Sequence, residues 1–104
     1  MKQITFEYDG KEYTLCYTRI SVKKMEKNGF SATEAEHHQM TAIYDLFAGA
    51  LLAKHGDLTK STVEKMFDRQ GDLADLANDL MAMYKDVFTT TQNPEGEIKR
   101  TKNW

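Results

Sequence analysis

The sequence predicts an α+β fold, in which an N-terminal antiparallel β-hairpin is followed by about four α-helices and a flexible C-terminal tail. Three observations predict this fold. Apolar and polar residues alternate over residues 2–17, on both sides of an Asp9-Gly10 dipeptide. Apolar residues then recur at helical spacing over residues 19–88. Residues 89–104 have no apolar period and contain the only proline.

The hairpin follows from its turn. Asp9-Gly10 suits a two-residue type I′ turn, because both central positions of that turn need a positive φ. A turn at this point pairs Phe6 with Tyr13 and Ile4 with Leu15. The apolar face then comprises Ile4, Phe6, Tyr8, Tyr13, Leu15 and Tyr17, and the polar face comprises Thr5, Glu7, Glu12, Thr14 and Cys16. A two-stranded ribbon is marginally stable alone, so the apolar face must pack on helices or on another subunit.

The helices are expected over about residues 19–28, 34–54, 60–70 and 72–88. Gly29 can adopt the left-handed conformation that ends the first of them. The run Ser31-Ala-Thr-Glu34 matches a capping box, which predicts that the second helix begins near residue 34 or slightly later. That helix is apolar nearly all round between residues 40 and 52, which predicts a place in the middle of the fold. Asp72 is a favourable N-cap for the fourth helix.

The fourth helix has a wider apolar arc than a single packed face needs. Its apolar residues are Leu73, Leu76, Ala77, Leu80, Met83, Tyr84 and Val87, and Asp72, Asp75, Asp79 and Asp86 lie opposite them. This arc, together with the open edges of the hairpin strands, predicts a homo-oligomer. The surface around Met81, Met83 and Phe88 is the predicted partner-binding region, because methionine adapts to varied partners.

Length and composition narrow the class of protein. A chain of 104 residues is long enough for one domain. We expect this domain over residues 1–88 and a tail over residues 89–104. A net charge of −2 argues against a generic binder of nucleic acid or anionic membranes. The longest apolar run, Leu46 to Ala53, is too short to span a bilayer, and the N-terminus lacks the apolar core of a signal peptide. The single cysteine suits a reducing cytosol, so we expect a cytoplasmic protein.

The chain contains histidine, cysteine and aspartate residues, but their spacing does not match that of a catalytic or metal-binding site. His37 and His38 are adjacent, so on a helix they point about 100° apart and cannot face one ion. Cys16 has no recognisable activating partner. Asp75 and Asp79 lack the backbone carbonyl ligands of a cation-binding loop. The sequence therefore predicts a protein that is not an enzyme and that uses no cofactor or metal.

Three runs of sequence carry a family resemblance that extends over roughly residues 2–88. They are ITFEYDGKEYTLCYTRISVKKMEKNGF, AIYDLFAGALLAKHGDLT and KSTVEKMFDRQGDLADLANDLMAMYKDVF. Together they resemble small phage and prophage proteins that are similar to tail assembly chaperones of long-tailed phages of Gram-positive bacteria. The resemblance implies a protein of the host cytoplasm that binds and solubilises the tape-measure protein and helps recruit tail-tube subunits. The resemblance does not assign a functional role to any particular residue of this chain.

Two other functions fit the same sequence. One is an oligomeric structural protein or head–tail adaptor of a phage particle. The other is a small nucleic-acid-binding regulator that would use the basic strip of Arg19, Lys23, Lys24 and Lys27, although the overall acidity of the chain disfavours it.

Overall fold

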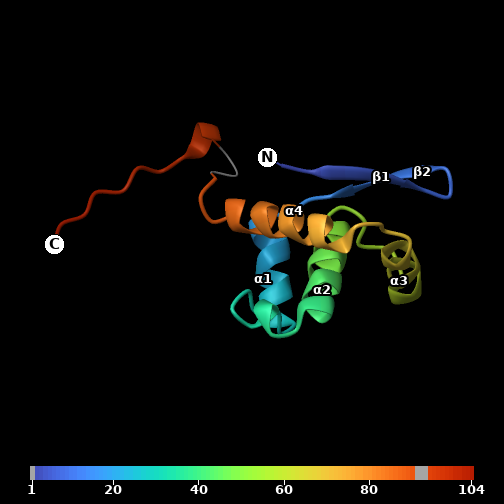
Figure 1. Cartoon of the computed structure of the whole chain (residues 1–104). Coiled ribbons are helices and arrows are strands. Elements are labelled where there is room, and N and C mark those ends of the chain that lie inside the picture. The colour runs from blue at the N-terminus through green and yellow to red at the C-terminus, as the bar shows by residue number, and fades with distance from the viewer. Residues whose placement is uncertain (1, 91–93) are drawn as a thin grey trace.

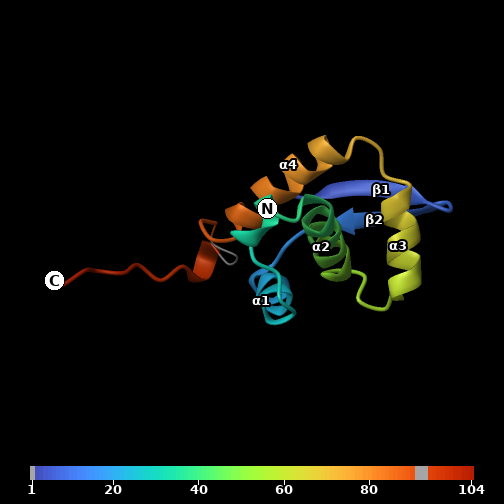
Figure 2. The same ribbon diagram turned by 60° about the horizontal axis from the view of Figure 1, so that its bottom comes forward.

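The fold is α+β, as predicted: an N-terminal antiparallel hairpin followed by four α-helices (Figure 1). A computed structural model describes residues 2–90 and 94–104. Its elements are β1 (Ile4–Tyr8), β2 (Lys11–Leu15), α1 (Arg19–Lys27), the 3₁₀ helix η1 (Glu34–Glu36), α2 (Gln39–Leu52), α3 (Lys60–Asp68), α4 (Leu73–Asp86) and the 3₁₀ helix η2 (Pro94–Gly96). The hairpin lies over the helices in Figure 1, with α3 below the end that carries the turn, and in Figure 2 α3 lies in front of the strands near that turn.

The predicted hairpin register is confirmed. Asp9 and Gly10 have φ values of 50° and 78°, as a type I′ turn requires, and Phe6 pairs with Tyr13. The apolar face packs on α2, where the ring centroid of Phe6 lies 5.9 Å from that of Phe47. At the turn, Arg69 after α3 lies 3.6 Å from the carboxylate of Asp9.

Cys16 is the one residue of the predicted polar face that the structure buries completely. The alternation ends with β2 at Leu15, and the chain then turns toward α2. There the amide of Cys16 donates a hydrogen bond to the carbonyl oxygen of Ala50 at 3.1 Å. The position of Cys16 is thus set by contact with a helix and not by the strand period.

The central position predicted for the second helix is confirmed, because α2 contacts β2 and each of the other three helices. Its buried residues are Ala42, Leu46, Phe47, Ala50 and Leu51. Gly49 lets α1 come close: a Cβ at this position would overlap the side chain of Met25. Gly29, with a φ of 98°, ends the α1 segment as predicted, and the amide of Phe30 donates to the carbonyl of Met25.

The second helix does not begin at the Ser31–Glu34 capping box but later, because α2 begins at Gln39. The carbonyl oxygen of Ser31, and not its hydroxyl group, accepts from the amide of Glu34, at 3.2 Å. A short 3₁₀ turn follows instead of an α-helix. Residues 34–38 contain a single apolar residue, Ala35, so an α-helix through them would gain little from burial.

The fourth helix begins as predicted, with the side chain of Asp72 accepting from the amide of Asp75. After α4 the chain turns, and the carbonyl oxygen of Thr90 accepts from the guanidinium of Arg19 at 3.4 Å. Residues 91–93 of the predicted flexible tail lie outside the described residues. Residues 97–104 run in an extended path away from the helices (Figures 1 and 2). The flexibility of the tail stays a prediction.

Tyr17 joins the hairpin to the centre of the fold. Its side chain is buried, and its hydroxyl group donates to the carbonyl oxygen of Leu46 at 2.6 Å. Its ring also packs edge-on against Tyr84 of α4. Burial, together with the neighbouring Tyr84, raises the pKa of Tyr17 far above its ordinary value of about 10.

The stability of the protein is therefore expected to fall as the pH rises above about 10. Tyr17 keeps its proton in the folded state and loses it in the unfolded state, so each further pH unit costs up to about 1.4 kcal/mol. Tyr17→Phe should lose about 1 kcal/mol at neutral pH with its hydrogen bond, and should then show a shallower alkaline decline. Urea unfolding between neutral pH and about pH 11 measures both effects. A parallel alkaline decline in the two proteins would contradict the assignment to Tyr17.

Candidate binding groove between α2 and α4

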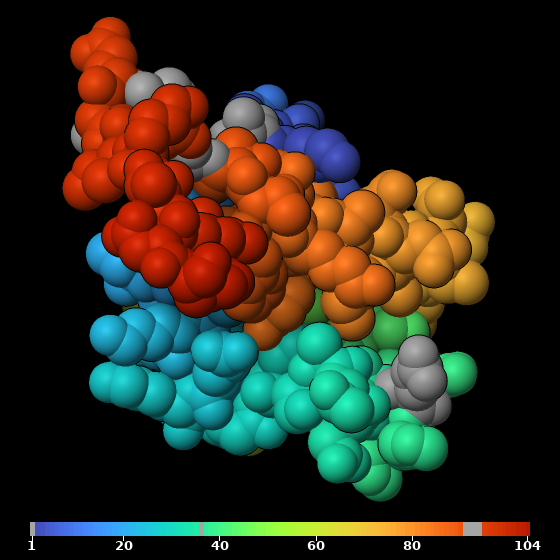
Figure 3. All heavy atoms as spheres, turned by 90° about the vertical axis from the view of Figure 1, so that its left-hand side faces the viewer, coloured from blue at the N-terminus to red at the C-terminus, as the bar shows by residue number. Residues whose placement is uncertain are grey.

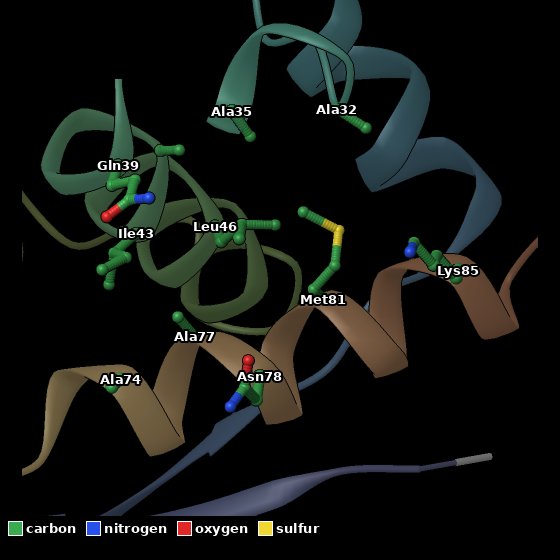
Figure 4. A pocket seen from close by; sticks show the side chains of 11 residues that line it. Ala32, Ala35, Gln39, Ile43, Leu46, Ala74, Ala77, Asn78, Met81 and Lys85 are labelled. Carbon is green, nitrogen blue, oxygen red and sulfur yellow. The ribbon is translucent and has the colours of Figure 1, made fainter. Parts of the chain in front are cut away.

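An apolar groove of about 450 Å³ lies between α4 on one side and α2 with its preceding segment on the other (Figure 4). It is lined by Ala32, Ala35, Gln39, Ala42, Ile43, Leu46, Ala74, Ala77, Asn78, Met81 and Lys85. The space-filling view of Figure 3 shows α4 lying across α1 and the chain that leads into η1. Three other surface hollows are smaller, with volumes of about 340, 160 and 130 Å³.

Small side chains make the groove hollow. Five of its eleven lining residues are alanines, which leave space beyond their Cβ atoms. Leu46, which is buried, is a large apolar residue at its base. The side chain of Met81 points from α4 into the space between Leu46 and Ala32 (Figure 4). Gln39, Asn78 and Lys85 are exposed and make the rim polar.

The helical period of α4 explains why it has a groove-lining side. Successive residues are about 100° apart, so α4 carries three stripes. The core stripe comprises Leu73, Leu76, Leu80, Met83, Tyr84 and Val87, all buried or half-buried. The groove stripe comprises Ala74, Ala77, Asn78, Met81 and Lys85, and the outer stripe comprises Asp75, Asp79, Ala82 and Asp86. The wide apolar arc expected from the sequence is thus the core stripe together with part of the groove stripe.

The three predicted partner-binding residues do not share one surface. Met81 lines the groove. Met83 is only 6% exposed and belongs to the core, so its assignment to a binding surface is wrong. Two residues of separation turn a helical side chain by about 200°, which sends Met81 and Met83 to different sides. Phe88 is 63% exposed beyond the end of α4, where its ring packs on Tyr84, and it does not line the groove.

Sequence reasoning missed most of the groove. Ala32, Ala35 and Ala74 are small residues whose pattern alone gives no signal of a binding surface. A hollow of this kind needs small residues from two segments to face each other. The spacing of Ala74, Asn78, Met81 and Lys85, at intervals of three and four residues, is the one sequence signal that identifies them as one face of a helix.

The hairpin edges differ from each other. The outer edge of β2 has partners at its end nearest α2, because the amide of Thr14 donates to Nε2 of His55 at 3.1 Å and the amide of Cys16, just after the strand, donates to Ala50. Over the described residues, β1 pairs only with β2. The outer edge of β1 is therefore the more open of the two edges.

The residues considered for chemistry lie apart from the groove lining. Cys16 is buried, and burial raises the pKa of its thiol despite the opposing effect of Lys54. A raised thiol pKa disfavours the thiolate that nucleophilic chemistry needs. His37 and His38 are exposed near the start of α2. Burial also raises the pKa of the Asp45 carboxyl group on α2.

The described residues contain neither a metal-binding cluster nor a membrane-spanning helix. Within residues 2–90 and 94–104, His, Cys, Asp and Glu side chains do not come together in a group of three or more that could hold a metal ion. Over the same residues, every helix is too short or too polar to cross a membrane.

Comparison with known proteins identifies the family. A family model described as a domain of unknown function, DUF5055, matches residues 1–104. Neither a curated protein nor a solved structure matches the chain. Since the family model covers the chain from end to end, the protein belongs to the DUF5055 family.

Proposed function

We propose that this protein is a phage tail assembly chaperone that binds the tape-measure protein through the groove between α2 and α4. It acts in the host cytoplasm as a binding protein and not as an enzyme, keeping its client soluble and helping to recruit tail-tube subunits. The groove, with its apolar base and polar rim, is the observation that carries the proposal. The resemblance of residues 2–88 to tail assembly chaperones supports the choice of client.

The lining of the groove suits an amphipathic helix, which is the form expected of a long tape-measure protein. A helix binds a groove by inserting side chains at intervals of three and four residues. The alanines on both walls let the helix backbone come close. Met81 is flexible and polarisable, so it can adjust to different apolar side chains along a client.

The charges on α4 suit a protein that keeps a client in solution. Asp75 and Asp79 are exposed on the outer stripe, and they remain in water when the groove is filled. A charged outer surface of one sign limits association between loaded complexes. The apolar residues of the client are then covered while the acidic side chains face the solvent.

Co-expression with the matching tape-measure protein tests this function. The unaltered protein should keep the tape-measure protein in the soluble fraction. Ala74→Arg places a long charged side chain over the groove from an exposed helical position, so it should weaken client binding roughly tenfold or more without disturbing the core. The matched control is Ala82→Arg, which makes the same substitution at an exposed position of α4 outside the groove.

The possible outcomes distinguish an error in the proposed function from an error in the proposed binding site. Loss of solubilisation with Ala74→Arg, and its retention with Ala82→Arg, supports the proposed groove. Equal solubilisation by both variants would place the client on another surface. Failure of the unaltered protein to solubilise the tape-measure protein would contradict the chaperone function and favour a structural or adaptor role. A chain ending at Thr90 should solubilise the client as well as the full chain does.

A further inference from the structure

The segment 97–104 carries two large apolar side chains that the rest of the molecule leaves uncovered. Ile98 is 86% exposed and Trp104 is 96% exposed. The segment extends away from the helices (Figures 1 and 2). Aromatic and large aliphatic side chains are frequent anchors of protein interfaces, because burying them removes much apolar area from water. Ile98 and Trp104 therefore have the chemistry of a docking segment.

The charge of this segment is opposite to that of α4. Residues 97–104 contain Lys99, Arg100 and Lys102 and one acidic residue, Glu97, whose carboxylate lies 2.7 Å from Nζ of Lys99. The outer stripe of α4 carries Asp75, Asp79 and Asp86, and Asp72 caps the same helix. This stripe lies next to the groove stripe on the helix surface. The residues that line the hollow include Lys85 and no acidic side chain, so it is the acidic stripe beside the hollow that complements the basic residues between Ile98 and Trp104.

We propose that residues 97–104 of one molecule bind the groove between α2 and α4 of a second copy of the same chain. Trp104 enters the hollow beside Met81, and the basic residues lie along Asp75, Asp79 and Asp86. A groove of about 450 Å³ falls within the range of roughly 300–1,000 Å³ of pockets that hold small organic ligands, so an indole ring fits it.

The geometry favours a second copy over the molecule's own groove, because the described segment leads away from the helical body (Figure 1). Such a contact joins two different surfaces, a segment and a groove. Each added molecule then offers one free segment and one free groove, so the contact extends into open chains of copies. The client of the proposed function would occupy the same groove, so this association is measured in the absence of the client.

Tryptophan fluorescence provides a direct test, because Trp104 is the only tryptophan in the chain. The full chain should sediment as species larger than its 12.0 kDa monomer as its concentration is raised in low-salt buffer. Over the same concentration range, the emission of Trp104 should shift to shorter wavelength as the indole leaves water. Added salt should weaken the association, because it screens the charges between the segment and α4.

Two variants and their mixture show whether the segment of one molecule binds the groove of another. Trp104→Ala removes the anchor, and Ala74→Arg blocks the groove, so each protein alone should associate at least about tenfold more weakly. Their mixture should form a one-to-one complex, because the first variant supplies an open groove and the second supplies an intact segment. Ser61→Arg, at an exposed position of α3 outside both the groove and the acidic stripe, is the control and should associate as the unaltered protein does.

Several results would overturn the proposal. A blue-shifted emission from a monomer at every concentration would mean that the segment binds its own groove. Association that persists in both variants would assign it to another surface, such as the edge of β1. A monomer with water-exposed tryptophan at all concentrations would exclude the contact altogether. Solubilisation of the tape-measure protein is a separate measurement and decides none of these outcomes.

Discussion

Replacing Met83 with aspartate is expected to destabilise the fold severely. Met83 is almost completely buried in the core cluster, among residues of the hairpin and all four helices. A carboxylate at this position would lose its hydration without gaining a partner, and a protonated one would still leave polar atoms unpaired. The cost should exceed about 4 kcal/mol, a large part of the 5–15 kcal/mol by which a small domain is stable. Circular dichroism and urea unfolding measure the loss.

Ala82→Asp is the matched control for this experiment. It puts the same side chain on the adjacent residue of α4, where the surface is exposed. Helix propensity and the nearby aspartates should reduce stability by no more than about 1 kcal/mol. A folded Met83→Asp protein, with a stability close to that of Ala82→Asp, would show that residue 83 is not in the core.

Phe47→Ala is expected to lower the free energy of unfolding by about 3–5 kcal/mol. The Phe47 side chain is fully buried in α2. Its ring centroid lies 5.9 Å from that of Phe6 on the hairpin and 5.5 Å from that of Phe67 on α3. Truncation therefore leaves a cavity where three elements meet, and the melting temperature should fall by well over 10 °C, taking roughly 4–8 °C per kcal/mol.

Ile20→Ala is the control for Phe47→Ala, because Ile20 is 81% exposed on α1. A surface truncation of this kind should change stability by no more than about 0.5 kcal/mol. If Phe47→Ala had as small an effect as Ile20→Ala, α2 could not be the centre of the core.

Much of the fold was predictable because its signals are local. The Asp9-Gly10 turn needs positive φ at two adjacent residues, which few other dipeptides allow. Gly29 ends α1, and Asp72 caps α4, through backbone conformations and hydrogen bonds within a few residues. The apolar period of α4 likewise depends on helix geometry alone. These elements follow from short stretches of sequence, whatever packs against them.

The sequence-based predictions that were wrong concern residues where the local pattern does not decide the structure. Cys16 continues the polar alternation of β2, yet its amide binds the carbonyl of Ala50, and the side chain is buried as a result. Ser31 and Glu34 match a capping box, yet a 3₁₀ turn forms there and α2 starts at Gln39. Met81 and Met83 have the same chemistry, and only the packing of α4 shows which of them is covered.

The order of the elements, the hairpin register and the core stripe of α4 could be derived from the sequence, because each depends on backbone geometry and on the spacing of apolar residues. The hollow across which the segment before α2 faces Ala74, Ala77 and Met81 is visible only once the helices are packed together. A groove requires small residues from separate parts of the chain to oppose each other without filling the space between them. This arrangement depends on the angle and distance at which the helices cross. The spacing of residues along one helix does not specify how that helix crosses another.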